Sequence, residues 1–326
     1  MKEPEIVVQH REQLTYLLTE AAEIEHGLMC CYLYAAMSLK RGERDGLTAA
    51  QAAVVDRWRA ELGAVAREEM LHLALVNNIL TACGFGAHFG RLNLPVSPGY
   101  HPAGIVVALA PLDAATLDHF IYLERPEGVE LPDGAGFAPA QHYQRPTPTD
   151  RLMAHAQDYL TVGHFYRGIE AALVDLAERM GEARLFCGDR AAQVDQALFP
   201  LPGIEPVVCL ATARAALERI VEQGEGSSAA SKTSHYCRFL AIREELAAMT
   251  AADPSFQPAH PAARNPLMRP PVDPVGRVFI DEPAAARVVD LANAMYGHSL
   301  RLLQRVYAPV GDTPQVQAAH AGRRSS

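Results

Sequence analysis

The chain has 326 residues, enough for one large domain or two smaller ones with a real hydrophobic core. Hydrophobic residues make up 49% of it, which is typical of a globular protein and excludes a disordered chain. The net charge of −9 and the pI of about 5.8 argue against a surface that grips a phosphate backbone, so no nucleic acid is expected as a partner.

Several absences bear on where the protein works. No apolar run reaches the roughly 18 residues of a membrane span, and no membrane partner is expected. The N-terminal stretch MKEPEIVVQHREQ lacks the apolar segment of a signal peptide. No CxxC motif occurs, and the adjacent Cys30 and Cys31 suit neither a disulfide framework nor a zinc ribbon. We therefore expect a cytoplasmic protein with reduced cysteines.

Two long helices are predicted at the start of the chain, over residues 10–41 and 48–83. The polar stretch RGERDG separates them, so they are expected to form an antiparallel hairpin. Residues 84–148 are a long excursion in which Pro and Gly recur. One short helix is predicted there, near 113–123, with Asp113 as its N-cap.

A third long helix is predicted over residues 150–181, beginning at Thr149 or Asp150. The fourth, over 206–250, is expected in two pieces, because the small-residue loop GEGSSAASKTS interrupts it. Residues 251–282 are again rich in Pro.

The chain is expected to end in an extra helix over 283–307 and a disordered tail over 308–326. Long helices joined by a long crossover predict an all-α fold. We expect a ferritin-type four-helix bundle with additional helices and long Pro-rich crossover segments, as a single domain over residues 1–307.

Glu25 interrupts the apolar stripe of the first helix near its middle. Read at alternating spacings of four and three, that stripe is Leu14, Leu18, Ala21, Glu25, Leu28, Tyr32, Ala35 and Leu39. Tyr32 lies two turns from Glu25. It could be an outer donor to a site or a redox-active phenol, although plain core packing is the more common role of a buried tyrosine.

Glu69 and His72 interrupt the stripe of the second helix in the same way. That stripe is Val55, Trp58, Leu62, Val65, Glu69, His72, Val76, Ile79 and Cys83. In an antiparallel hairpin the middles of the two helices lie side by side. Glu25 is therefore expected beside Glu69 and His72. Two buried carboxylates in one core are costly unless they share a cation. Di-metal carboxylate bundles take one Glu from each of two helices and Glu-x-x-His from each of the other two, and these residues supply half of that set.

The third and fourth helices leave their contributions open. Glu170 is the only charged member of the third-helix stripe, and His164 in VGHFY is its rival. The fourth helix has no intact Glu-x-x-His. It offers Glu222 and Glu225 before the loop and His235 after it, and these could still reach one metal pair.

Several segments of the chain resemble a known family. The segments are EIEHGLMCCYLYAAMSLK, REEMLHLALVNNIL, LDHFIYLERPEG, TVGHFYRGIEAAL, VEQGEG…SHYCRF and LANAMYGHSLRLLQRVY. They resemble the ferritin-like domain of the iminophenyl-pyruvate dimer synthase family, which includes the imine-dimerising enzymes of violacein and rebeccamycin biosynthesis. The resemblance covers residues 10–307. Because the characterised synthases are usually much longer, we expect a stand-alone version of that domain. The resemblance implies a metal-dependent redox enzyme of specialised metabolism.

The ligand set favours an oxidase or oxygenase with two iron ions, manganese being the alternative. It would act on a small amino-acid-derived substrate with dioxygen or peroxide. Two other interpretations are a metal-storage bundle and a helical interaction module without metal. The long excursions favour a shaped small-molecule pocket over storage. The long apolar helices are compatible with a homodimer.

Overall fold

The computed structural model describes residues 4–91, 93–96, 101–102, 105–137, 156–224, 232–272 and 275–308. The longer helices are α1 (Arg11–Ser38), α2 (Ala49–Ala82), α4 (Val162–Met180), α6 (Leu210–Gly224), α7 (His235–Ala252) and α8 (Pro283–Val306). The shorter elements are α3 (Ala114–Leu123), α5 (Glu182–Leu185), the 3-10 turns η1 (Glu43–Asp45) and η2 (Arg190–Ala192), and the strands β1 (Pro266–Leu267) and β2 (Val278–Phe279), which pair in parallel.

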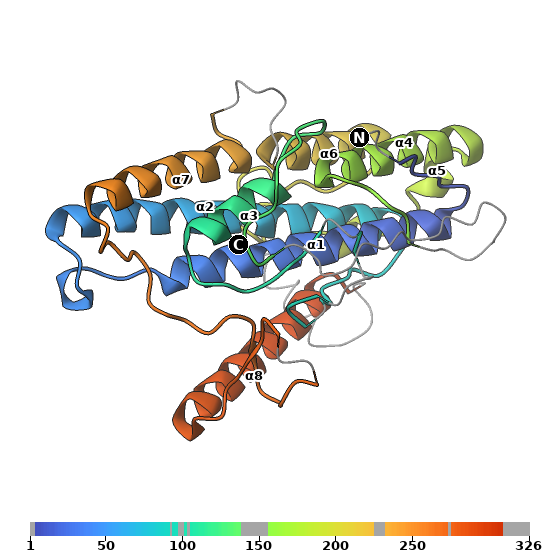
Figure 1. Ribbon diagram of the computed structural model, residues 1–326. Coiled ribbons are helices and arrows are strands. Elements are labelled where there is room, and N and C mark those ends of the chain that lie inside the picture. Colours follow the sequence, from blue (N-terminus) through green and yellow to red (C-terminus); the bar gives the residue numbers. More distant parts are fainter. Residues whose placement is uncertain are drawn as a thin grey trace.

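The helices α1 and α2 form the predicted antiparallel hairpin (Figure 1). A capping box starts α2: the Thr48 side chain accepts from the backbone N–H of Gln51, and the Gln51 side chain accepts from that of Thr48. The first helix ends at Ser38, earlier than predicted, because Leu39 adopts an extended backbone and bridges to Ala259. The hairpin contributes more buried hydrophobic residues to the core than any other pair of the described helices.

The helix α4 begins later than the predicted third helix, which was placed over 150–181. Residues 156–161 precede it without helical structure, and residues 150–155 lie outside the described residues. Gln157 explains the difference. Its side chain accepts from the N–H of Val7 and donates to the carbonyl of Val7, so this segment is held in an extended form beside the N-terminal residues. The helix then starts at Thr161, whose hydroxyl accepts from the His164 N–H.

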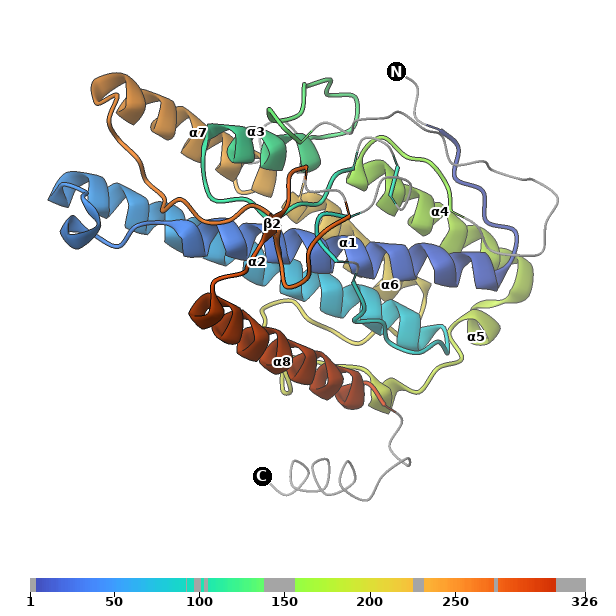
Figure 2. The same ribbon diagram turned by 60° about the horizontal axis from the view of Figure 1, so that its bottom comes forward.

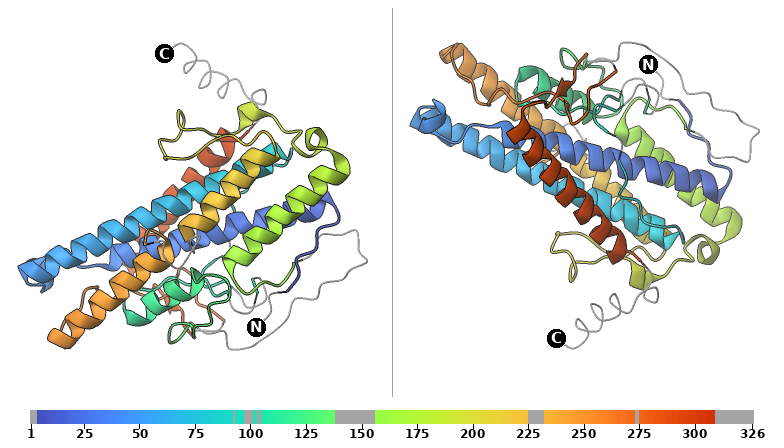
Figure 3. Two further views of the ribbon diagram at one scale, coloured as in Figure 1. Left: turned by 90° about the horizontal axis from the view of Figure 1, so that it is seen from above. Right: turned by 90° about the horizontal axis from the view of Figure 1, so that it is seen from below.

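The helices α6 and α7 lie end to end along α2 and together supply the fourth helix of the bundle (Figure 3). The interruption agrees with the prediction of two pieces. Ser234 caps α7 by accepting from the Cys237 N–H, so His235 becomes the first residue of the helix. The break therefore places the start of α7 against the middle of α2.

Two additional helices flank the bundle on opposite sides. The short helix α3 packs against α7, and Asp113 caps it as predicted, accepting from the Thr116 N–H. The helix α8 crosses the other face of the α1–α2 hairpin, as the view from below shows (Figures 2 and 3). The predicted all-α class and bundle architecture are confirmed. Among the described residues, no helix has the length and apolar character needed to cross a membrane. The predicted tail lies almost wholly outside the described residues.

Candidate metal centre

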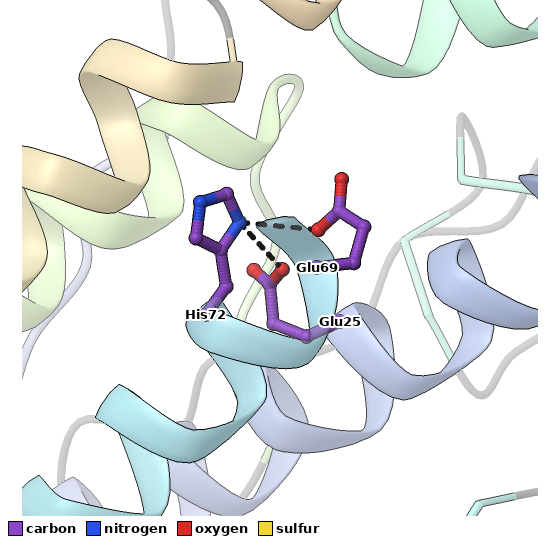
Figure 4. A group of neighbouring side chains, drawn as sticks. All are labelled: Glu25, Glu69 and His72. Carbon is purple, nitrogen blue, oxygen red and sulfur yellow. Dashed lines mark hydrogen bonds and ion pairs between the residues drawn. The ribbon is translucent and has the colours of Figure 1, made fainter. Parts of the chain in front are cut away.

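Glu25 of α1 and Glu69 and His72 of α2 converge in the middle of the hairpin (Figure 4). Each of the three side chains is at most 2% exposed. The Nδ1 atom of His72 lies 3.2 Å from Glu25 Oε2 and 3.1 Å from Glu69 Oε2. The structure thus brings together the three residues that interrupt the apolar stripes of the two helices.

A second group of the same kind adjoins the first and shares Glu69 with it. Its other members are Glu124, the C-cap residue of α3, and His235, the first residue of α7. The Nδ1 atom of His235 lies 2.9 Å from Glu69 Oε1 and 3.7 Å from Glu124 Oε1. Glu69 therefore faces one imidazole with each of its two oxygens.

The donor atoms of the two groups fit a pair of divalent ions. Within each group the ligand atoms lie within 4.8 Å of one another. Glu69 Oε1 and His235 Nδ1 are both buried and face each other without an aligned hydrogen bond. A buried polar atom left in this way is costly, and a cation between the two would satisfy both. Carboxylate oxygens and imidazole nitrogens are the donors that iron and manganese accept in bundle cores.

Outer partners orient both imidazoles in the same way, with Nδ1 toward the cluster and Nε2 away from it. The Nε2 atom of His72 lies 3.0 Å from Gln223 Oε1, and that of His235 lies 2.9 Å from Glu68 Oε2. Glu68 is held in turn by the guanidinium of Arg238. With Nε2–H donating outward, Nδ1 faces the carboxylates, and displacement of the Nδ1 proton by a cation would give the ligating form of histidine.

Two buried phenols fix the outer carboxylates. Tyr32 donates its hydroxyl hydrogen to Glu124 Oε1, and Tyr166 of α4 donates to Glu25 Oε1. Both tyrosines are almost fully buried, so neither bond competes with water. Tyr32 thus touches the cluster, as the sequence pattern allowed, and Tyr166 does so as well.

The charges of the cluster shift its pKa values strongly. Burial, reinforced by the neighbouring Glu69, raises the pKa of Glu25 to about 8. Burial alone would lower the pKa of His72, but the carboxylates of Glu69 and Glu25 outweigh it and raise the value to about 10. For Glu69 the two histidines outweigh burial and hold its pKa well below the usual value. The metal-free cluster therefore stores protons that a cation would replace.

Two of the candidate ligands on α4 lie away from the cluster. Glu170 is on the side of α4 that faces α6, where it forms an ion pair with Arg214 at 2.6 Å. His164 lies near the start of the helix, and its Nε2–H donates to the carbonyl oxygen of Pro4 at 2.8 Å. The position on α4 that reaches the cluster is that of Tyr166, one turn before Glu170.

Of the two candidates near the end of α6, the one that the structure describes lies apart from the cluster. Glu222 is exposed and lines a groove of about 580 Å³ between α4 and α6, together with Glu170 and Arg214. Glu225 lies outside the described residues. Gln223, between them, is the residue of this segment that touches a histidine of the cluster.

The sequence pattern missed Glu124, because the short helix near 113–123 was treated as part of the excursion rather than of the bundle. A signal for it exists. Leu117, Ile121 and Glu124 follow the same spacing of four and three as the long stripes, and the two apolar members are buried. Tyr166 lies four residues before Glu170 on the same helical stripe, and nothing in the sequence distinguishes its hydroxyl from that of an ordinary core tyrosine.

Comparisons with known proteins agree with the helical bundle fold. A sequence model described as ferritin-like matches residues 18–244. The 2-imino-3-(indol-3-yl)propanoate dimerase of Chromobacterium violaceum is 29% identical over 280 residues, 80% of this chain. The dichlorochromopyrrolate synthase of Lentzea aerocolonigenes is 27% identical over 335 aligned positions, covering 91% of this chain. These matches confirm the resemblance that the sequence segments indicated.

The chain spans only 26% and 31% of the lengths of these two relatives. A crystal structure of a ferritin-like protein from Caulobacter vibrioides has a TM-score of 0.55 and 21% identity, and the match covers 98% of this chain and 95% of that one. At that identity the match supports the helical fold alone.

Proposed function

Because the chain belongs to the ferritin-like family, we propose that its buried cluster holds two divalent metal ions and that the protein is an oxidoreductase. One observation carries the proposal: Glu69 stands between His72 and His235, with one oxygen toward each. A carboxylate that faces two ligand groups is suited to bridge two ions. Iron is the expected metal, with manganese as the alternative.

The residues divide into two ligand sets with a shared member. Glu25, Glu69 and His72 would hold one ion, and Glu69, Glu124 and His235 the other. A pair of such ions supplies redox and Lewis-acid chemistry toward dioxygen or peroxide. In the same site Gln223 and Glu68 orient the imidazoles, and Tyr166 and Tyr32 orient the outer carboxylates. Burial keeps water away from the ligands and from the two tyrosines.

The names of the relatives suggest the class of substrate. One acts on 2-imino-3-(indol-3-yl)propanoate and the other is a dichlorochromopyrrolate synthase. By similarity we propose a small amino-acid-derived substrate and a role in specialised-metabolite biosynthesis. The groove between α4 and α6 adjoins the small cavity at the cluster, since Tyr166 and Val221 line both, and we propose it as the place where such a molecule binds.

Elemental analysis of the full chain, purified without chelator and then loaded anaerobically with ferrous iron or manganese, tests the metal centre. The wild type is expected to bind about two equivalents. Glu69→Gln is expected to lose both, because it removes the shared carboxylate while preserving side-chain volume. Glu170→Gln, on the same type of residue outside the cluster, should retain them. Circular dichroism checks that both variants fold.

Wild-type protein that binds no metal after loading would overturn the proposal. If the metal is present, dioxygen consumption measured with amino acids and their imines tests the oxidoreductase step. Consumption that stops after one oxidation of the bound ions, whatever organic compound is added, would point to metal storage instead.

A further inference from the structure

The back of the α1–α2 hairpin carries a second cavity, of about 270 Å³, beneath α8. Side chains from α1, α2, α8 and the segment around 199–201 line it, among them Met29, Leu33, Leu73, Leu300 and Leu303. Its volume is slightly below the range of about 300–1,000 Å³ that drug-sized ligands occupy. It has room for a molecule of one or two rings.

This cavity is separate from the carboxylate–histidine cluster. His26 and Met70 line the cavity, while their neighbours in sequence, Glu25 and Glu69, belong to the cluster. Successive residues of a helix point about 100° apart, so the hairpin presents the cluster on one face and the cavity on another. An occupant of the cavity does not share space with one at the metals.

The residues that line the cavity disfavour a charged ligand. None of the described residues that line the cavity is Lys, Arg, Asp or Glu. A charged molecule would lose its hydration there without gaining a partner of opposite charge. The carboxylate-bearing substrates considered above are therefore poor occupants, whereas an uncharged apolar molecule gains contact with thioether, aliphatic and aromatic side chains.

The polar groups at the edge of this lining are engaged inside the protein. The hydroxyl of Tyr296, from α8, is hydrogen-bonded to Nε2 of the fully buried His26 and lies 3.3 Å from Cys30 Sγ. The guanidinium of Arg91 lies over the same ring, 5.6 Å from its centroid. The cavity therefore presents an almost wholly apolar wall to an occupant.

The helix α8 covers the cavity, but its side chains do not fill the space beneath it. No residue of α8 is fully buried, and Leu300 and Leu303 remain half-buried over the cavity. The helix is anchored at its end by the buried Tyr307, which donates its hydroxyl hydrogen to the carbonyl of Ala74 at 3.1 Å. An anchored helix over unfilled apolar space gains packing contacts when a molecule enters beneath it.

We propose that this cavity binds a small, uncharged and mainly aromatic or aliphatic molecule, held by apolar contacts. Such binding is a second function of the chain, independent of the metal centre. An occupant would add packing contacts to α8.

Three matched probes test the proposal on the full, metal-loaded chain: 2-naphthol, naphthalene and 2-naphthoate, with affinity measured by fluorescence titration. The two uncharged probes are expected to bind saturably, and 2-naphthoate at least about tenfold more weakly because the lining offers its charge no partner. Leu300→Trp fills the cavity and should weaken both uncharged probes at least about tenfold. Leu302→Trp, on the exposed side of the same helix, should change them less than about twofold.

Tyr296→Phe examines whether apolar contacts alone hold the occupant. It should change the affinities of 2-naphthol and naphthalene alike by less than about twofold, since the hydroxyl is engaged inside the protein. Leu303→Phe provides a milder filling of the cavity if Leu300→Trp fails to fold, and metal content measured on every variant separates loss of this site from loss of the metal centre. The proposal is overturned if neither uncharged probe binds, if 2-naphthoate binds as well as 2-naphthol, or if the filling variants weaken binding no more than Leu302→Trp does.

Discussion

Glu69 presents one oxygen to each of two histidines, His72 and His235. Both imidazoles are strongly held in their protonated form when no metal is present, because the buried carboxylates around them outweigh the effect of burial. Glu25 meanwhile has a pKa raised to about 8, chiefly by burial. At the scale of single residues, the metal-free site therefore replaces the positive charge of the ions by protons.

These protons give the metal-free protein a defined pH dependence. His72, with a folded pKa of about 10 against an ordinary 6.5, contributes stability that is complete below pH 6.5 and is lost as pH rises through 10. Glu25, at about 8 against 4.5, changes stability in the same direction. The unfolding free energy measured by urea titration in the presence of chelator should fall between pH 7 and 9.5.

The manganese-loaded protein is the control for this titration. Its ligands are held deprotonated by the ion, so its unfolding free energy should fall less over the same interval or rise. Metal-free protein whose stability increases from pH 7 to 9.5 would contradict the assignment of protons to His72 and Glu25.

Tyr166 is the residue through which α4 acts on the cluster. Tyr166→Phe leaves Glu25 Oε1 without its donor, and we expect a loss of about 1–3 kcal/mol in the unfolding free energy together with weaker manganese binding. Tyr34→Phe is a matched control, because that phenol donates to the backbone carbonyl of Ala263 and not to the cluster. It should leave manganese affinity unchanged. Equal affinities in the two variants would exclude a role for Tyr166 in holding Glu25.

At the scale of elements, the break between α6 and α7 decides what the fourth helix contributes. His235 enters the cluster as the first residue of a capped helix, while Gln223 approaches from the end of the preceding one. Arg238, one turn into α7, joins this helix to Glu61 and Glu68 of α2. The position of His235 therefore depends on a half-buried ion-pair network between the two helices.

Arg238→Gln tests that dependence. We expect it to lower the unfolding free energy by about 1–2 kcal/mol and to weaken binding of the second ion, since Glu68 loses the group that holds it against His235. Arg57→Gln removes an exposed pair between the same two helices, with Glu245, and should cost less than about 1 kcal/mol. Urea unfolding and metal titration of both variants provide the comparison, and identical effects would assign Arg238 a purely surface role.

Helix periodicity predicted the hairpin and its meeting point well, because the polar interruptions at Glu25, Glu69 and His72 stand out against long buried stripes. It did less for α4. Glu170 follows the same spacing, but its side chain pairs with Arg214 of α6, and an intrahelical pattern carries no information about such a partner. Glu124 was missed since a ten-residue helix in an excursion offers few turns over which to recognise a stripe.

At the scale of the whole molecule, the ligand groups come from four separate elements: α1, α2, the end of α3 and the start of α7. Metal binding should therefore stabilise the bundle as a unit. At a free manganese concentration 100 times its dissociation constant, mass action contributes about 2.7 kcal/mol, which is a rise of several degrees in the thermal midpoint for a protein of this size.

Scanning calorimetry with and without manganese measures that rise. Magnesium at the same concentration is the control, because it prefers oxygen ligands in an octahedral arrangement and should shift the midpoint little. A manganese-loaded protein with an unchanged midpoint would mean that the ions bind outside the folded cluster.

The two faces of the α1–α2 hairpin have a consequence for how this sequence can diverge. Adjacent residues such as Glu25 and His26, or Glu69 and Met70, serve different compartments. Inserting or deleting one residue between the helix caps and these positions would rotate each of them about the helix axis by about 100°. Residues of the cluster would then no longer face one another, and residues that line the cavity would no longer face it. Substitution can remodel either compartment alone, but changes in helix length cannot, so natural variation in the length of the hairpin should be confined to the turn at 42–47.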